Sequence, residues 1–169
     1  MDALSRLPIL TGDPTLERDT ETLYDALSEL IRVYQFRDRD RICCYDVSIT
    51  QCYALEELVR REGMTLNELA AHLYLDKSTA SRVVDALERK AYVERVPHPQ
   101  DRRAVVLTPT PTGKTLYQTI RQGILDEEQK LLADFDPQVR QAMTQLIARL
   151  ARAAAGRVEA GGGSCCRIS

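Results

Sequence analysis

Apolar residues recur every three or four positions along most of the chain, which is the pattern of amphipathic helices. Stripes of this kind occupy residues 23–34, 66–73, 80–87, 116–132 and 139–154. After Tyr92 the pattern changes to alternation, with apolar residues at Val93 and Val96 and again from Val105 to Leu107, beyond a polar segment. The chain is therefore predicted to be mainly helical, with one small β-hairpin after the 80–87 stripe.

Two short helices in the middle of the chain have boundaries set by local capping residues. Thr65 is followed three residues later by Glu68, so each side chain can bond the backbone amide of the other residue. A helix is therefore expected to begin at Leu66. After a short connection, Asp76 can cap a second helix. The two together make a helix-turn-helix pair.

The second of these helices is apolar on one face only. Small, polar or basic side chains crowd its first two turns: Lys77, Ser78, Thr79, Ser81 and Arg82. A DNA-recognition helix needs this asymmetry, because its first residues approach bases and phosphates while its other face packs on a partner helix. Small hydroxyl groups permit close approach, and an arginine can reach guanine or a phosphate. An ordinary helical hairpin with solvated Ser and Thr is the alternative.

The segment between the two predicted strands carries two prolines and two adjacent arginines, Arg102 and Arg103. The prolines stiffen this tip and the arginines give it positive charge. Such a projection suits a minor groove, whose negative potential attracts arginine. A simple solvated turn is the alternative interpretation.

The order and spacing of these elements resemble the MarR family of winged helix-turn-helix regulators over residues 20–156. The matching motifs are LDKSTASRVVDALE at 75–88, YVER at 92–95, DRR at 101–103 and LT at 107–108. The resemblance implies a mainly α fold with a small β wing. It also implies that Ser78, Thr79, Ser81 and Arg82 face the major groove, and that Arg103 enters the minor groove with Asp101 orienting it.

Three residues depart from the family pattern. Ala91 stands where the family usually has glycine, which is the residue that adopts positive φ most cheaply, so a different helix cap is expected there. His98 occupies a position that is often acidic. Pro109 interrupts the second strand, which is therefore expected to end by Thr108. None of the three removes a predicted DNA contact.

Composition and charge fit a small regulator with no membrane-spanning segment. The chain has 169 residues, 44% of them hydrophobic, which is enough for one core and one domain. A net charge of −2 argues against indiscriminate binding of polyanions. Between residues 76 and 103, Lys and Arg outnumber Asp and Glu by seven to five, a modest local surplus. The start of the chain has no signal-peptide pattern, so a cytoplasmic location and no membrane partner are expected.

Three long amphipathic helices outside the helix-turn-helix exceed what its small core can cover. By family resemblance they form a homodimer that binds a pseudo-palindromic operator in double-stranded DNA. Packing of these helices within a monomer is the alternative. The predicted organisation is an extension at 1–15, a MarR-type domain at 16–156 and a flexible tail at 157–169. Within the domain, helices at 16–36 and 111–156 mediate dimerisation, and the winged helix-turn-helix occupies 48–108.

The five cysteines suggest how such a regulator senses its signal. Cys43 and Cys44 precede a helix that the capping pair Ser48 and Gln51 predicts to begin near Ile49, and Cys52 lies in that helix. A helix N-terminus and nearby arginines favour thiolates, which bind soft ions. Cys43, Cys44 and Cys52 are therefore a candidate site for As(III) or another soft metal ion as effector, although Cys52 alone fits a core position. Cys165 and Cys166 in the glycine-rich tail are further candidates.

Other readings of the same residues stay open. The thiols fit a sensor of peroxide or electrophiles, and the effector can instead be an organic acid bound between the dimer helices and the DNA-binding part. A protein of another class, a metallochaperone-like thiol carrier, is a further alternative. The chain has neither a Cys-x-x-Cys redox motif nor a phosphate-binding loop, so it is not expected to be an enzyme. No cofactor is expected to be required for DNA binding.

Overall fold

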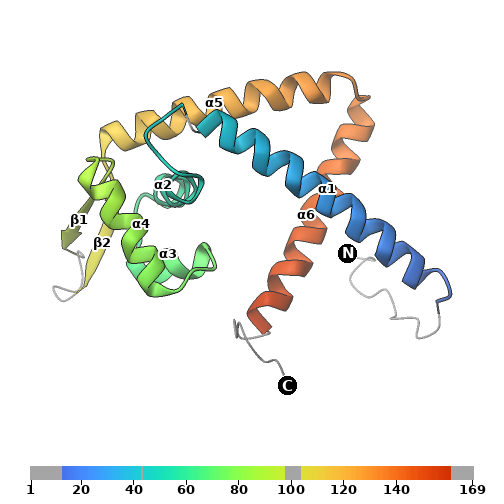
Figure 1. Cartoon of the computed structure of the whole chain (residues 1–169), viewed down its shortest axis with the longest axis horizontal. Helices are drawn as coiled ribbons and strands as arrows, with labels where there is room; N and C mark the ends of the chain where they lie inside the picture. The colour runs from blue at the N-terminus through green and yellow to red at the C-terminus, as the bar shows by residue number, and fades with distance from the viewer. Residues whose placement is uncertain (1–12, 43, 98–103, 161–169) are drawn as a thin grey trace, which may run out of the picture. The chain divides into compact units, whose positions relative to one another are not determined.

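The computed structural model describes residues 13–42, 44–97 and 104–160 (Figure 1). The elements in these ranges are α1 Leu16–Ile42, α2 Ile49–Arg61, α3 Leu66–His72, α4 Lys77–Arg89, β1 Val93–Pro97, β2 Val105–Pro109, α5 Pro111–Ala133 and α6 Pro137–Ala160. The two strands pair antiparallel. The predicted fold class, mainly helical with a small β wing, is confirmed.

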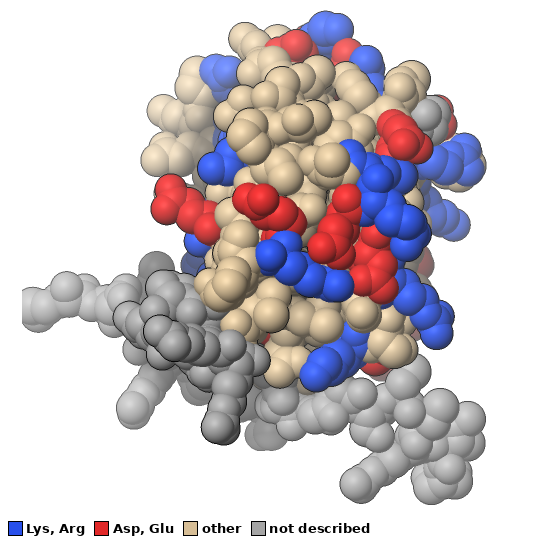
Figure 2. Space-filling model, turned by 90° about the vertical axis from the view of Figure 1, so that its left-hand side faces the viewer, with Lys and Arg blue, Asp and Glu red and all other residues tan. Residues whose placement is uncertain are grey.

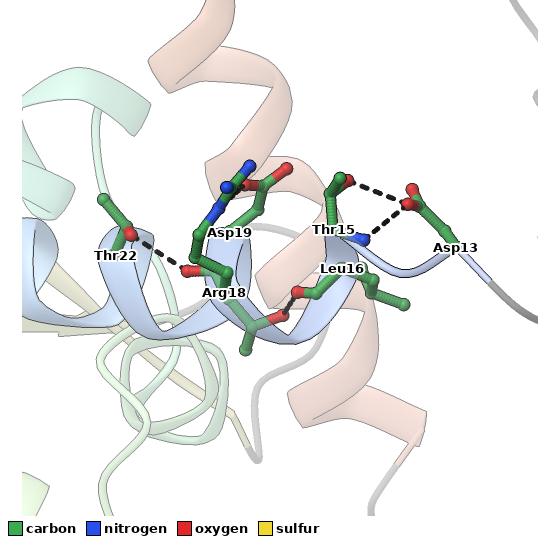
Figure 3. Close-up of polar contacts among 7 residues, drawn as sticks. Asp13, Thr15, Leu16, Arg18, Asp19 and Thr22 are labelled. Carbon is green, nitrogen blue, oxygen red and sulfur yellow. Dashed lines mark hydrogen bonds and ion pairs between the residues drawn. The ribbon is translucent and has the colours of Figure 1, made fainter.

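The chain divides into two compact units, residues 1–40 and 41–169, and α1 crosses the boundary between them. In the first unit, the start of α1 is held by local hydrogen bonds (Figure 3). The amide and hydroxyl of Thr15 both donate to Asp13 Oδ1, at 2.9 and 2.8 Å. These two bonds lower the pKa of the Asp13 carboxyl. One turn further, the Thr22 hydroxyl donates to the Arg18 carbonyl at 2.9 Å.

Helix α1 is longer than the sequence predicted. The predicted helix ended at residue 36, whereas the charged segment 37–41 is also helical and α1 ends at Ile42. The Arg37 guanidinium lies 4.0 Å from the centre of the Tyr34 ring and pairs with Asp38 at 3.0 Å. Ile42 is almost fully buried in the core of the second unit. The sequence of this segment shows charge rather than an apolar stripe, because the buried residue of α1, Ile42, is the last residue of the helix. The helical extension could therefore not be predicted from the pattern.

The predicted helix starts in the second unit are confirmed. At α2, Ser48 and Gln51 form a capping box, with the Gln51 amide 3.2 Å from Ser48 Oγ. At α3, Thr65 and Glu68 form another, in which the Thr65 amide donates to Glu68 Oε2 at 2.7 Å. Asp76 caps α4. These bonds satisfy amide groups that a helix leaves without partners in its first turn.

The core of the second unit lies between α2, α3, α4, α5 and the sheet. Its largest fully buried side chains are Ile42, Leu55, Leu58, Leu69, Leu87, Leu107, Val84 and Val93. Each buried leucine contributes about 2 kcal/mol relative to exposure. Cys52 belongs to this core, with 5% of its surface exposed. Helix α4 is therefore held against α2 and α3 by its apolar face.

The sheet tolerates a proline that was expected to end it. Pro109 is the last residue of β2 and lies opposite Val93, so the prediction that β2 ends at Thr108 was one residue short. Leu107 turns its amide and carbonyl away from β1, toward Met64, with N–O distances of 2.8 and 3.2 Å. In an antiparallel pair, residues two apart point the same way, so Pro109 also faces away from β1. Its missing N–H therefore costs the hairpin no hydrogen bond.

Helix α6 also passes its predicted end. The prediction stopped at residue 156, whereas α6 continues to Ala160. Gly156 lies within it, and an added Cβ there would meet nothing within 4 Å. A glycine in a helix interior weakens the helix without ending it, so α6 continues through Gly156.

Candidate nucleic-acid interface

Helix α4 separates buried from exposed residues as a recognition helix does. Ala80, Val84 and Leu87 are fully buried. Lys77, Ser78 and Arg82 are exposed, and Thr79 and Ser81 are half-buried. The helix therefore presents the predicted polar residues of its first two turns on the side opposite its packing face.

Asp76 organises the start of α4 through three hydrogen bonds. The Thr79 amide donates to Asp76 Oδ1 at 2.9 Å, which is the predicted cap. The Ser78 hydroxyl also donates to Oδ1, at 2.6 Å, and the Thr79 hydroxyl donates to Oδ2, at 2.6 Å. Led by the Ser78 and Thr79 hydroxyl bonds, these contacts hold the pKa of the Asp76 carboxyl well below its usual range. The sequence predicted the amide bond but not the two hydroxyl bonds.

The turn between α3 and α4 contains an exposed aromatic residue that the sequence reasoning missed. Tyr74 has a φ of 53° and 63% of its surface exposed. A tyrosine in the left-handed region is strained by its Cβ. The turn is fixed on both sides, because the Tyr74 amide donates to the Ala71 carbonyl at 3.2 Å and the Leu75 amide to the Ala70 carbonyl at 2.9 Å. A positive φ at a residue other than glycine has no clear sequence signal, so the conformation of Tyr74 could not be predicted.

The C-terminal end of α4 has the left-handed cap that glycine usually forms, although the residue there is alanine. Ala91 adopts a φ of 57°, the conformation for which glycine is favoured, so the expectation of a different cap is wrong. The Tyr92 amide donates to the Leu87 carbonyl at 3.0 Å and the Ala91 amide to the Glu88 carbonyl at 2.9 Å. The Thr110 hydroxyl donates to the Ala91 carbonyl at 2.7 Å. These tertiary and local bonds together hold alanine in a backbone conformation that it does not favour.

Lys90 ties the same end of α4 to the segment before α2. Its ammonium donates to the Asp46 carbonyl and, at 3.2 Å, to Gln51 Oε1. It also lies 3.3 Å from the Asp46 carboxylate. Gln51 belongs to the capping box of α2, so Lys90, the C-cap residue of α4, links the end of this helix to the first turn of another.

On the face shown in Figure 2, basic and acidic side chains are intermixed rather than gathered in a continuous basic patch. Arg95 in β1 accounts for part of this mixture, because it pairs with Asp85 at 2.6 Å and with Glu88 at 3.3 Å. Two of the seven basic residues counted between 76 and 103, Lys90 and Arg95, are thus engaged by acids of the same unit. Among the described basic residues of this stretch, Lys77 and Arg82 at the start of α4 and Arg89 in its last turn are exposed.

The predicted wing tip lies outside the described residues. Strand β1 ends at Pro97, opposite Val105 at the start of β2. The structure therefore fixes the two strands that carry the tip, whereas Arg102 and Arg103 remain predictions as DNA contacts.

The cysteines are only partly described. Cys44 is exposed, and Cys52 is buried among the core residues of α2. In residues 13–42, 44–97 and 104–160, no three His, Cys, Asp or Glu side chains form a group that could hold a metal ion. Cys43, Cys165 and Cys166 lie outside those ranges, so the predicted metal site at Cys43, Cys44 and Cys52 stays a prediction. Among the described helices, none is long and apolar enough to cross a membrane.

Comparison with known proteins gives the same fold and a family. Residues 45–104 match the model of the MarR family. The chain is 28% identical over 95 residues to the HTH-type transcriptional regulator YsmB of Bacillus subtilis, which covers 56% of this chain and 65% of that regulator, slightly less than two thirds of its length. It is 30% identical over 115 residues to the HTH-type regulator ML2140 of Mycobacterium leprae, covering 68% of this chain and 76% of that one.

Solved structures extend the likeness over most of the chain. A MarR family protein from Bacillus stearothermophilus superposes with a TM-score of 0.75 at 22% identity, covering 82% of this chain and 96% of that one. FabT from Streptococcus pneumoniae, solved in complex with DNA, superposes with a TM-score of 0.71 at 19% identity, covering 79% and 95%. The family model matches the residues that form the helix-turn-helix pair and the first strand of the wing. The chain belongs to the MarR family of winged helix-turn-helix transcriptional regulators.

Proposed function

We propose that the chain is a sequence-specific DNA-binding repressor that reads the major groove with α4. The observation that carries this proposal is the division of α4 into a fully buried apolar face and an exposed polar start. Arg82 is exposed in the second turn, where an arginine can reach guanine or a phosphate. FabT, which shares the fold, was solved in complex with DNA, and this supports DNA binding by the present chain.

The proposed active form is a homodimer. Apolar side chains that a monomer leaves in water support it, and they lie on both long terminal helices. On α1 they include Leu23, Leu30 and Ile31, and on α6 Val139, Leu146 and Ile147. Large exposed apolar side chains in regular stripes mark surfaces that bind another protein. A two-fold dimer would present two α4 helices about 34 Å apart, which predicts a pseudo-palindromic operator.

Fluorescence anisotropy on DNA from the region upstream of the protein's own gene tests DNA reading. Arg82→Ala is expected to weaken specific binding by about ten- to a hundredfold, the effect of losing one good base contact. Arg89→Ala is the matched control, because Arg89 is also an exposed arginine and lies in the last turn of the same helix. Equal weakening by both substitutions, or by neither, would contradict a reading role for the start of α4.

We also propose that the repressor releases DNA when an inducer acts on thiols before α2. The exposed position of Cys44, four residues before the N-cap Ser48, supports a reactive thiol there. As(III) or another soft metal ion at Cys43, Cys44 and Cys52 is the proposed effector. Oxidation of the same thiols by peroxide is the alternative, and an organic ligand is another. Because Cys52 is buried, an effector that used it would have to open the core locally, which would connect sensing to the packing of α2.

Parallel titrations of the DNA complex with arsenite and with peroxide separate these effectors. Release by arsenite from the wild type but not from Cys43→Ser/Cys44→Ser supports the metalloid site. Release by peroxide alone supports a redox switch. If neither reagent releases DNA from a protein that binds it, the cysteine proposal is wrong and organic ligands become the subject of the search. Cys52→Ser shows whether the buried thiol takes part.

A further inference from the structure

The hydroxyl groups of Ser78 and Thr79 both give their protons to Asp76. The Oγ–Oδ1 distance for Ser78 and the Oγ1–Oδ2 distance for Thr79 are both 2.6 Å. This length is typical of an O–H group that donates to an ionised carboxylate, which is about twice as strong as a bond between neutral groups. The lowered pKa of Asp76 keeps the carboxylate ionised, and hence an acceptor only, throughout the neutral range.

The number of hydrogen-bond donors and acceptors on the Ser78 and Thr79 hydroxyls determines which groups of a partner they can bind. A hydroxyl has one proton to donate and two lone pairs with which to accept. With the proton directed to Asp76, Ser78 and Thr79 present only lone pairs at the start of α4. An incoming acceptor, such as a phosphate oxygen, would have to displace a charge-assisted bond to be recognised by either hydroxyl.

We propose that Asp76 makes Ser78 and Thr79 readers of amino groups. In the major groove, the exocyclic amino groups are adenine N6 and cytosine N4, whereas guanine O6, guanine N7 and thymine O4 are acceptors. The two hydroxyls accept from the amino groups and discriminate against the acceptors. Asp76 is thus a positioning residue that determines specificity without touching DNA. The inference deepens the proposed function and rests on it, because the proposed DNA contact is what brings bases to α4.

Arg82 supplies the complementary chemistry one turn later. Its guanidinium can only donate, so it suits the guanine acceptors that the hydroxyls exclude. The first two turns of α4 therefore offer acceptors at Ser78 and Thr79 and donors at Arg82. This order of hydrogen-bonding groups along one helix predicts that adenine or cytosine contacts Ser78 or Thr79 and that guanine contacts Arg82.

Selection of bound duplexes from a random pool tests the inference first with the wild type, Ser78→Ala and Thr79→Val. The base pairs at which each substitution relaxes the selected sequence are those that the hydroxyl reads. An adenine or cytosine facing the hydroxyl at those positions is expected. No relaxation by either substitution would overturn the inference. Because every base pair carries one amino group in the major groove, base analogues decide which group of the selected pair is read. Failure of the wild type to enrich any sequence would instead contradict the proposed function itself.

Base analogues then test the amino group directly. Replacing the selected adenine by purine, or the selected cytosine by 2-pyrimidinone, removes the amino group alone. The wild type is expected to lose about three- to tenfold in affinity, the usual effect of one hydrogen bond. Ser78→Ala, measured on the same pair of duplexes, corrects for the weaker base pair of the analogue and is expected to lose less than twofold. An equal loss in both proteins would overturn the role of the Ser78 hydroxyl.

Asp76→Asn tests the role of the carboxylate, and it keeps the helix cap because asparagine caps as well as aspartate. Its amide oxygen replaces Oδ1, which accepts from the Thr79 amide and Ser78, and its NH₂ group then faces Thr79 Oγ1. The Thr79 proton is released while that of Ser78 stays bound. Selection is therefore expected to shift toward guanine or thymine at the base pair read by Thr79 and to remain unchanged at that read by Ser78. An unchanged sequence at both positions would overturn the inference.

Discussion

Arg95 Nη2 lies 2.6 Å from Asp85 Oδ1, a contact that joins the first strand of the wing to the recognition helix. The same guanidinium lies 3.3 Å from Glu88 Oε2, one turn further along α4. These two contacts join β1, one of the strands that carry the tip, to the exposed side of α4. We therefore predict that Arg95 affects DNA recognition through the geometry of the wing rather than through its charge.

Arg95→Met is expected to weaken operator binding several-fold and to leave its salt dependence unchanged. The methionine keeps much of the aliphatic stem but loses both ion pairs, so the wing loses its fixed direction. The pairs are well exposed, and the loss of stability should stay within about 1 kcal/mol. Affinity measured over a range of salt concentrations checks this. A decrease of about one in the slope of log K against log salt would mean that Arg95 contacts a phosphate instead.

Two glycines of α5 should respond in opposite ways to the same substitution. A Cβ added at Gly113 would collide with the Tyr92 carbonyl oxygen, which is backbone and cannot move aside. Gly113→Ala is therefore expected to destabilise the protein by about 2 kcal/mol or more, as overpacking does. Gly123→Ala is the matched control, because its Cβ meets nothing within 4 Å. It should stabilise the helix by up to about 1 kcal/mol. Urea unfolding of the two variants gives the comparison, and equal effects would contradict this packing of α5.

Ala91→Gly is expected to stabilise the protein modestly. Glycine removes the cost of about 1–2 kcal/mol that an L side chain has in the left-handed region, and it loses about 0.4–1 kcal/mol through the greater freedom of the unfolded chain. The net gain should be about 0.5–1 kcal/mol in the free energy of unfolding. Ala91→Val, with a β-branched side chain at the same φ of 57°, should destabilise. If glycine destabilises, the cap in solution differs from that of the structure.

The cap of α4 should fail in acid. The folded-state pKa of Asp76 lies below its ordinary value of 3.8, so the ionised cap stabilises the fold above about pH 4, and this contribution is lost as the pH falls through the folded-state pKa. In Asp76→Asn the cap does not titrate. The difference in unfolding free energy between wild type and variant, measured from pH 6 to pH 2, should therefore move in favour of the variant as the pH falls. A constant difference would show that the Asp76 carboxylate does not contribute through its charge.

The sequence by itself determined the local features of the fold. The caps at Thr65, Asp76 and Ser48 depend on atoms three residues apart, and the helical stripes depend on spacings of three and four, so both can be read without the fold. The hairpin followed from the change of period after Tyr92 and from the charged segment between its strands. The candidate reading residues at the start of α4 were found in the same way, because polarity and spacing along one helix are local properties.

Tertiary structure decided what depends on residues far apart in the chain. Pro109 is tolerated because Leu107 turns toward Met64, and α1 reaches Ile42 because a distant core buries that residue. Arg95 pairs with Asp85 of α4 because the hairpin folds back over this residue. Such charges and prolines can be recognised in the sequence, but the residues that contact them cannot. Which group a side chain faces is set by packing between elements, and that packing determines whether a charge remains available to bind a partner.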